Sequence, residues 1–175
     1  MPATVAVLLL VVLAEVPPSL TRLPDDVVGA MAAVRISPGD KGFKIPGAVP
    51  PAHLVRGDLD GNGYEDWVIV VETRRRVAIL VAYGFNGEWR SGSIDVWGGP
   101  ECKYCSQGPR PVGLTLLPPG SHERVPPHDG PLIVNERARI SSEQPGVCVA
   151  LADGHRRAYY LGPHAWGFVD LGLER

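Results

Sequence analysis

Residues 66–97, DWVIVVETRRRVAILVAYGFNGEWRSGSIDVW, decide the fold of this chain. The runs 66–72 and 77–85 are apolar on both faces, which is typical of central strands buried on two sides. The charged segment 73–76 separates them and predicts a turn between paired strands. Asn86-Gly87 lies between aromatic-rich arms, which is a strong signal for a hairpin. We therefore predict a three-stranded antiparallel meander over 66–97.

The segments around this meander extend the β pattern in both directions. A short strand is expected at 53–58, and possible strands at 112–117 and 131–136 are followed by three more at 146–152, 156–162 and 166–171. Pro24, the acids after it and the helical spacing of Val27 and Met31 predict a short helix from Asp25. The predicted fold class is α+β, with an N-terminal helix, a mainly antiparallel sheet built from hairpins, and long Pro/Gly-rich loops.

Composition is consistent with a folded domain. The 175 residues are 45% apolar and 21% charged, and they include 21 Gly and 18 Pro. Such a chain can build a core, and its Gly and Pro content favours a turn-rich β protein over a helical bundle. The net charge of −2 argues against nucleic acid as a partner, because nucleic acid selects basic surfaces.

The N-terminus resembles a secretory leader. Val5 to Ala14 is an apolar run of the length of a signal-peptide core, too short to span a bilayer. We expect a signal peptide at 1–14, a helix and linker at 15–52, a β-rich calcium-binding domain at 53–175, and no stable membrane span. The expected location is secreted or periplasmic, and the expected state is a monomer.

The stretch GDLDGNGYED, residues 57–66, carries more acid than a turn requires. Its side-chain oxygens recur at alternate positions, and Gly63 permits a sharp bend at the sixth loop position. Calcium prefers six to eight oxygen ligands, and a tight loop can present them to one centre. Ile69 stands where a helix–loop–helix site has its bidentate Glu, so the pattern is not that of an EF-hand. The sequence predicts a Ca²⁺ site between two strands.

This loop resembles the calcium loop of FG-GAP and VCBS-type repeats, whose pattern is Asp-x-Asp-x-Asp/Asn-Gly-x-x-Asp. Here it occurs as a single copy. The resemblance implies these metal ligands: Asp58, Asp60, Asn62, the main chain of Tyr64, and Asp66. More loosely, the acidic loop, Ile45-Pro46 and AYYLGPHAWGFVDL (158–171) resemble a group of small secreted bacterial proteins of unassigned function. That likeness implies a stand-alone α+β domain and no known chemistry.

Three cysteines leave several readings open. Cys102 and Cys105 form a Cys-x-x-Cys pair, and Cys148 lies on a predicted strand. In an oxidising compartment we expect Cys148 to pair with Cys102 or Cys105. A zinc site, a redox pair and free thiols are the alternatives. A thiol-disulfide or metal-dependent enzyme using Cys102 and Cys105 therefore competes with the main hypothesis.

No nucleophile elbow, phosphate loop or dinucleotide fingerprint is present, so we predict no catalytic residue. The predicted function is a calcium-binding domain with a binding or structural role, whose partner is a protein or a glycan. All four tryptophans lie on predicted strands, and we expect most of them in the core. As an alternative, Trp89 and Trp97, which flank the predicted hairpin, are candidates for lining a surface that binds sugar or peptide.

Overall fold

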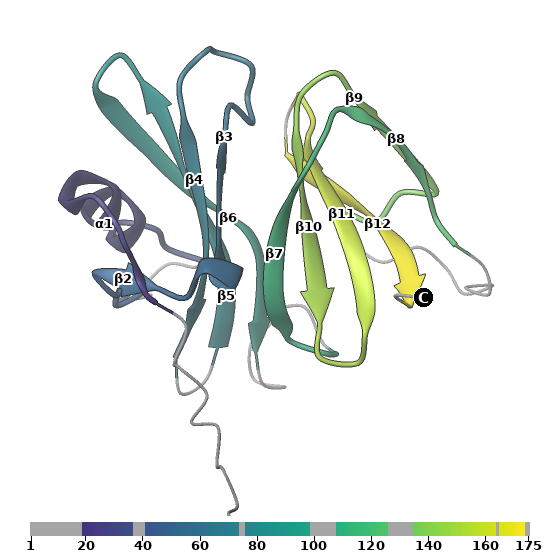
Figure 1. The fold of residues 1–175 in the computed structure, drawn as a ribbon, viewed down its shortest axis with the longest axis horizontal. Coiled ribbons are helices and arrows are strands. Elements are labelled where there is room, and N and C mark those ends of the chain that lie inside the picture. The colour runs from purple at the N-terminus through teal and green to yellow at the C-terminus, as the bar shows by residue number, and fades with distance from the viewer. Residues whose placement is uncertain are drawn as a thin grey trace, which may run out of the picture.

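The computed structural model describes residues 19–36, 41–73, 76–98, 108–125, 135–163 and 165–173. Two four-stranded antiparallel sheets pack against each other, and one short helix covers the outer face of the first sheet (Figure 1). The predicted mainly antiparallel, hairpin-rich α+β fold is confirmed. Within these ranges, no helix has the length and apolar character needed to cross a bilayer.

The first sheet contains the meander predicted from residues 66–97. Its strands, in spatial order, are β3 (Leu54–Gly57), β4 (Asp66–Glu72), β5 (Arg76–Phe85) and β6 (Glu88–Gly98). Asn86 and Gly87 join β5 to β6 with φ angles of 49° and 81°. Positive φ at both central residues is what the tight hairpin turns that match strand twist require.

The second sheet is a second meander with one hairpin inserted. Its strands, in spatial order, are β12 (Trp166–Leu173), β11 (His155–Leu161), β10 (Gly146–Leu151) and β7 (Pro111–Leu117). Between β7 and β10 the chain forms the hairpin β8 (Gly120–Glu123) and β9 (Arg139–Ser142). Of the predicted strand 131–136, residues 131–134 lie outside the described part, and Glu136 forms a bridge with Phe168.

The main core lies between the two sheets. Val68 and Val70 of β4 and Ile79 and Val81 of β5 face the second sheet, which contributes residues such as Phe168. The alternate residues of β4 and β5 face the opposite way and belong to a separate buried cluster. Both faces of these strands are therefore covered, which explains their uninterrupted apolar sequence.

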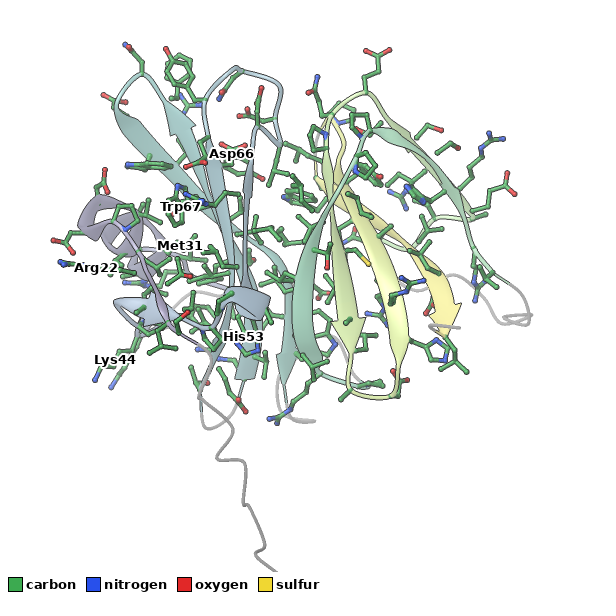
Figure 2. All side chains as sticks on the ribbon, in the orientation of Figure 1. Arg22, Met31, Lys44, His53, Asp66 and Trp67 are labelled. Atoms are coloured by element: carbon green, nitrogen blue, oxygen red, sulfur yellow. The ribbon has the colours of Figure 1, made fainter. Side chains whose placement is uncertain are left out.

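The second buried cluster joins the N-terminal segment to the first sheet. Helix α1 (Asp25–Ala32) places Val27 and Met31 on one face, because residues four apart are neighbours on a helix. Figure 2 shows Met31 between the helix and the strands, with Arg22 on the outer side. The connecting elements are β1 (Thr21–Arg22), β2 (Ala48–Val49) and the short 3₁₀ helix η1 (Pro51–His53).

Candidate metal site

The acidic loop connects β3 to β4 at one end of the first sheet. Gly57 and Asp66 pair across the two strands, so the loop between them is closed at its base. Gly61 and Gly63 have φ angles of 77° and 85°, a region that Gly adopts without steric cost. These two glycines allow the chain to fold back, so that the carboxylates at both ends of the loop approach each other.

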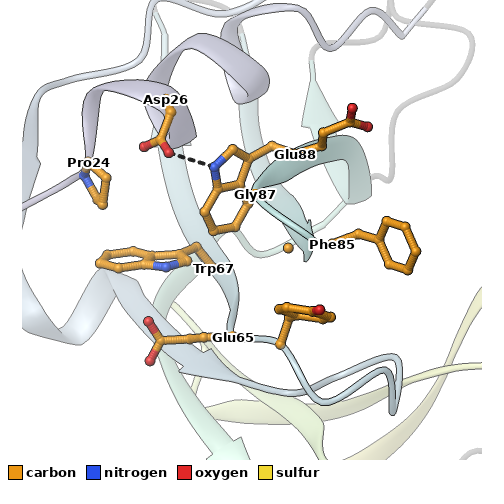
Figure 3. Close-up of a pocket in the computed structure, with 10 residues that line it drawn as sticks. Pro24, Asp26, Glu65, Trp67, Phe85, Gly87 and Glu88 are labelled. Carbon is orange, nitrogen blue, oxygen red and sulfur yellow. Dashed lines mark hydrogen bonds between the residues drawn. The ribbon is translucent and has the colours of Figure 1, made fainter.

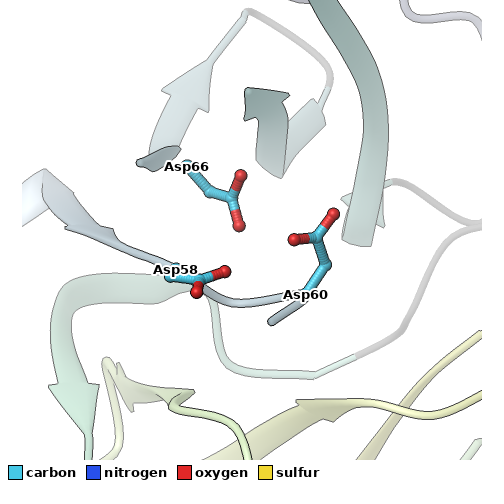
Figure 4. Close-up of side chains that lie close together, drawn as sticks. All are labelled: Asp58, Asp60 and Asp66. Carbon is cyan, nitrogen blue, oxygen red and sulfur yellow. The ribbon is translucent and has the colours of Figure 1, made fainter. Parts of the chain in front are cut away.

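Three carboxylates meet inside this loop. Oxygen atoms of Asp58, Asp60 and Asp66 all lie within 4.8 Å of one another (Figure 4). Within the described part of the chain, no ion pair joins any of the three to a basic side chain. Like charges this close repel one another unless a cation or a proton intervenes. The cluster could hold a metal ion.

Asp66 is the most deeply placed of the three and is fully buried at the start of β4. Its Oδ2 accepts the backbone N–H of Leu59 at 2.7 Å, and its Oδ1 accepts that of Gly84 at 3.0 Å. Burial raises the pKa of this carboxyl to about 6, and the two backbone N–H groups oppose the rise. Removal from water disfavours the charged form, whereas a nearby cation would favour it.

One side-chain oxygen of Asp58 forms a hydrogen bond with the loop and the other does not. Its Oδ2 accepts the backbone N–H of Gly63 at 2.9 Å. Its Oδ1 is buried and has no hydrogen-bond partner among the described residues. A buried carboxylate oxygen without a partner is costly, because it has lost water and gained nothing in return. A cation bound among the three carboxylates would satisfy this oxygen, so the donor set fits a metal ion.

The two remaining predicted ligands lie beside the cluster with a different arrangement. The side-chain NH₂ of Asn62 donates to Asp60 Oδ2 at 3.0 Å and to the carbonyl of Gly84 at 2.8 Å. The amide oxygen of Asn62 accepts the backbone N–H of Tyr64 at 2.8 Å. Asn62 therefore ties the loop to β5, and its oxygen would have to turn to contact an ion.

Two residues at the loop were not anticipated from the sequence. The backbone N–H of Gly84 on β5 donates to Asp66 and its carbonyl accepts from Asn62, so this glycine fixes the middle and the C-terminal end of the loop to the sheet. Gln144, which precedes β10 of the second sheet, lies against the loop. A Cβ at Gly61 would lie 2.6 Å from the Gln144 side chain. Neither contact leaves a local sequence signal, because each depends on how distant segments pack.

Of the three cysteines, Cys148 alone lies in the described part of the chain. Cys148 lies buried on β10. Cys102 and Cys105 lie outside the described residues, so the disulfide, zinc and redox alternatives stay predictions. Comparison of the chain with protein families, with curated proteins and with solved structures gave no match. The acidic loop and its surroundings are therefore the features of the molecule that indicate a function.

Proposed function

We propose that the loop 58–66 binds one Ca²⁺ ion and that this ion stabilises an exported domain with a binding or structural role. The observation that carries the proposal is the buried, unpartnered Oδ1 of Asp58 beside two further carboxylates. The resemblance of the loop to FG-GAP and VCBS-type calcium loops supports it, as does the apolar leader, which favours secretion or the periplasm.

The chemistry of the donors favours calcium over other common metals. The cluster contains only carboxylates, and hard oxygen donors suit Ca²⁺ or Mg²⁺, whereas zinc prefers sites with His and Cys. Calcium also accepts irregular geometry and more ligands than magnesium does. The ligands would be Asp58, Asp60, Asp66, the main chain of Tyr64, and Asn62 after its amide turns.

The expected effect of calcium is a rise in thermal stability. An ion that binds only the folded state at 100 times its dissociation constant stabilises by about 2.7 kcal/mol. For a chain of this length that corresponds to a rise in Tm of roughly 5 to 10 °C. The measurement is a thermal melt of residues 15–175 in EDTA, then in excess calcium, and then in excess magnesium.

The chain offers a matched control for this experiment. Asp60 and Asp153 are both exposed turn residues, and each accepts the backbone N–H two residues further on, at 3.1 and 3.0 Å. We expect Asp60→Ala to abolish the calcium-dependent rise and Asp153→Ala to retain it. An equal rise in the native protein and in Asp60→Ala would contradict the proposed site.

A further inference from the structure

A pocket of about 340 Å³ lies beside the acidic loop, where α1, β4 and the β5–β6 hairpin meet (Figure 3). The two sites share a wall, because Tyr64 and Glu65 of the loop line the pocket and Gly84 contributes to both. The pocket is open to solvent, so a side chain presented by another molecule could enter it.

Four aromatic side chains form the walls of this pocket. Trp67 is buried and Trp89 is half-buried, whereas Tyr64 and Phe85 are 44% and 51% exposed. The rings of Tyr64 and Phe85 pack edge to face, with centroids 6.1 Å apart. Exposed aromatic rings that are held in place offer flat, electron-rich faces to a ligand.

The polar part of the pocket is acidic. Asp26, Glu65 and Glu88 line it, and no lysine or arginine is among the described residues that do. The Trp89 indole N–H donates to Asp26 Oδ2 at 2.7 Å and lowers the pKa of this carboxyl, so Asp26 is charged at neutral pH. Among the described residues, no ion pair involves Asp26 or Glu88, whereas Glu65 pairs with Arg56. Aromatic faces combined with carboxylates that lack a basic partner suit a cation, because both attract positive charge.

The chain already shows this type of contact at the edges of the pocket. The guanidinium of Arg56 lies 5.1 Å from the ring centroid of Trp67 and 3.9 Å from the Glu65 carboxylate. The guanidinium of Arg90 lies 5.9 Å from the ring centroid of Phe85. Both arginines lie outside the described lining of the pocket, so they are examples of the contact and do not occupy the space.

We propose that this pocket binds an arginine side chain from a basic peptide segment of a partner protein. A guanidinium group stacks on aromatic rings and pairs with carboxylates through several N–H donors at once, which a lysine ammonium cannot match. The proposal names a class of partner, and it does not require that a metal ion binds the neighbouring loop.

The test is a titration with acetylated, amidated tetra-arginine, followed by tryptophan fluorescence and by calorimetry. Tetra-lysine, tetra-glutamate and maltohexaose are the comparison ligands. We expect tetra-arginine to bind most tightly, and its affinity to fall as salt rises, because exposed charges are screened. Absence of binding, or tighter binding of maltohexaose, would overturn the proposal.

Two variants localise the binding. Phe85→Ala removes an exposed ring and Glu88→Gln removes an exposed charge, so neither should unfold the protein. Each is expected to weaken tetra-arginine binding roughly three- to tenfold. The controls Leu173→Ala and Glu123→Gln change residues elsewhere that are also exposed, and they should leave affinity unchanged. Equal losses in variants and controls would place the binding elsewhere and overturn the assignment.

The same titration in EDTA and in calcium separates this proposal from the metal site. Tetra-arginine binding with no calcium-dependent rise in Tm would support the pocket and contradict the metal site. A calcium-dependent rise without tetra-arginine binding would do the opposite.

Discussion

The molecule contains two groups of acidic side chains that handle charge in opposite ways. In the loop 58–66, three carboxylates lie together, and none forms an ion pair with a described basic side chain. The second group consists of Asp95 on β6 and Asp170 on β12, and each of these carboxylates lies close to a basic side chain of β11. Asp95 Oδ2 accepts the hydroxyl of Tyr159 at 2.8 Å and lies 3.9 Å from Arg157 Nη1. Asp170 Oδ1 lies 3.4 Å from His155 Nδ1 and accepts the N–H of Gly172.

The presence of a described basic side chain in only one of the two groups indicates the role that a bound metal ion would have in the loop. The second group contains its own cation, because the Arg157 guanidinium lies among these acids and over the ring of Phe168. The first group has only backbone N–H donors and a neighbouring amide, which cannot neutralise three charges. A cation bound in the loop would balance the charge of its carboxylates, as Arg157 does in the second group.

The largest expected effect tests the internally compensated group. Asp95→Ala removes the carboxylate that forms an ion pair with buried Arg157 and accepts the hydroxyl of Tyr159. Loss of one member of a buried ion pair typically costs about 3 to 5 kcal/mol. We therefore expect Asp95→Ala to lose about 4 kcal/mol of unfolding free energy, measured by urea denaturation in EDTA and in calcium.

The effect of calcium on this variant decides whether the two groups are independent. We expect calcium to raise the stability of Asp95→Ala as much as that of the native protein, because its loop is intact. If Asp95→Ala lost its calcium response, the two groups would be coupled. The loop could then no longer be treated as independent of the Asp95 group.

An intermediate effect is expected at the glycine that fixes the loop to the sheet. A Cβ at Gly84 would lie 2.7 Å from the carbonyl oxygen of Glu65, which is backbone and cannot move cheaply. Overpacking of this kind costs about 1 to 3 kcal/mol. We expect Gly84→Ala to lose about 2 kcal/mol and to weaken calcium binding, as measured by denaturation and by calcium titration.

The matched control lies on the adjacent strand. A Cβ at Gly92 meets nothing within 4 Å, so Gly92→Ala is expected to change stability by less than about 0.5 kcal/mol. If both variants behaved alike, the loop would not depend on its contact with Gly84.

Local sequence predicted the strands better than it predicted their packing. The apolar runs of β4 and β5 and the Asn86-Gly87 turn matched the structure, because each is specified by adjacent residues. The hairpin β8–β9 was missed, since it is short, polar and half exposed. Trp97 was a candidate surface residue and is 2% exposed, because the second sheet covers it.

In the candidate site, too, local sequence predicted the loop residues but not the features that depend on packing. Spacing alone brought Asp58, Asp60 and Asp66 to one loop, and the structure places their oxygens together. The pocket beside Tyr64 is also lined by Gly84 of β5 and by Asp26 of α1, which are remote from the loop in sequence. Tertiary packing decides such features, so no local pattern could have indicated them.

The smallest expected effect is a pH dependence that arises from Asp66 in the loop. The pKa of Asp66 is raised from its ordinary value of 3.8 to about 6 in the metal-free fold. A raised carboxyl pKa adds stability that is complete below pH 3.8 and is lost as the pH rises through 6. As far as Asp66 is concerned, the metal-free protein should therefore be more stable at pH 5 than at pH 7.

Calcium should reverse this order, because it binds the ionised carboxylate and competes with the proton. Below pH 6 the apparent calcium affinity is expected to fall by up to about tenfold per pH unit for one competing proton. Calcium titrations at pH 7, 6 and 5, with melts in EDTA at each pH, measure both effects. A calcium affinity that stayed constant from pH 7 to pH 5 would show that Asp66 does not contact the ion. The buried carboxylate would then be a structural acceptor for Leu59 and Gly84, and the loop would need no external cation at its inner end.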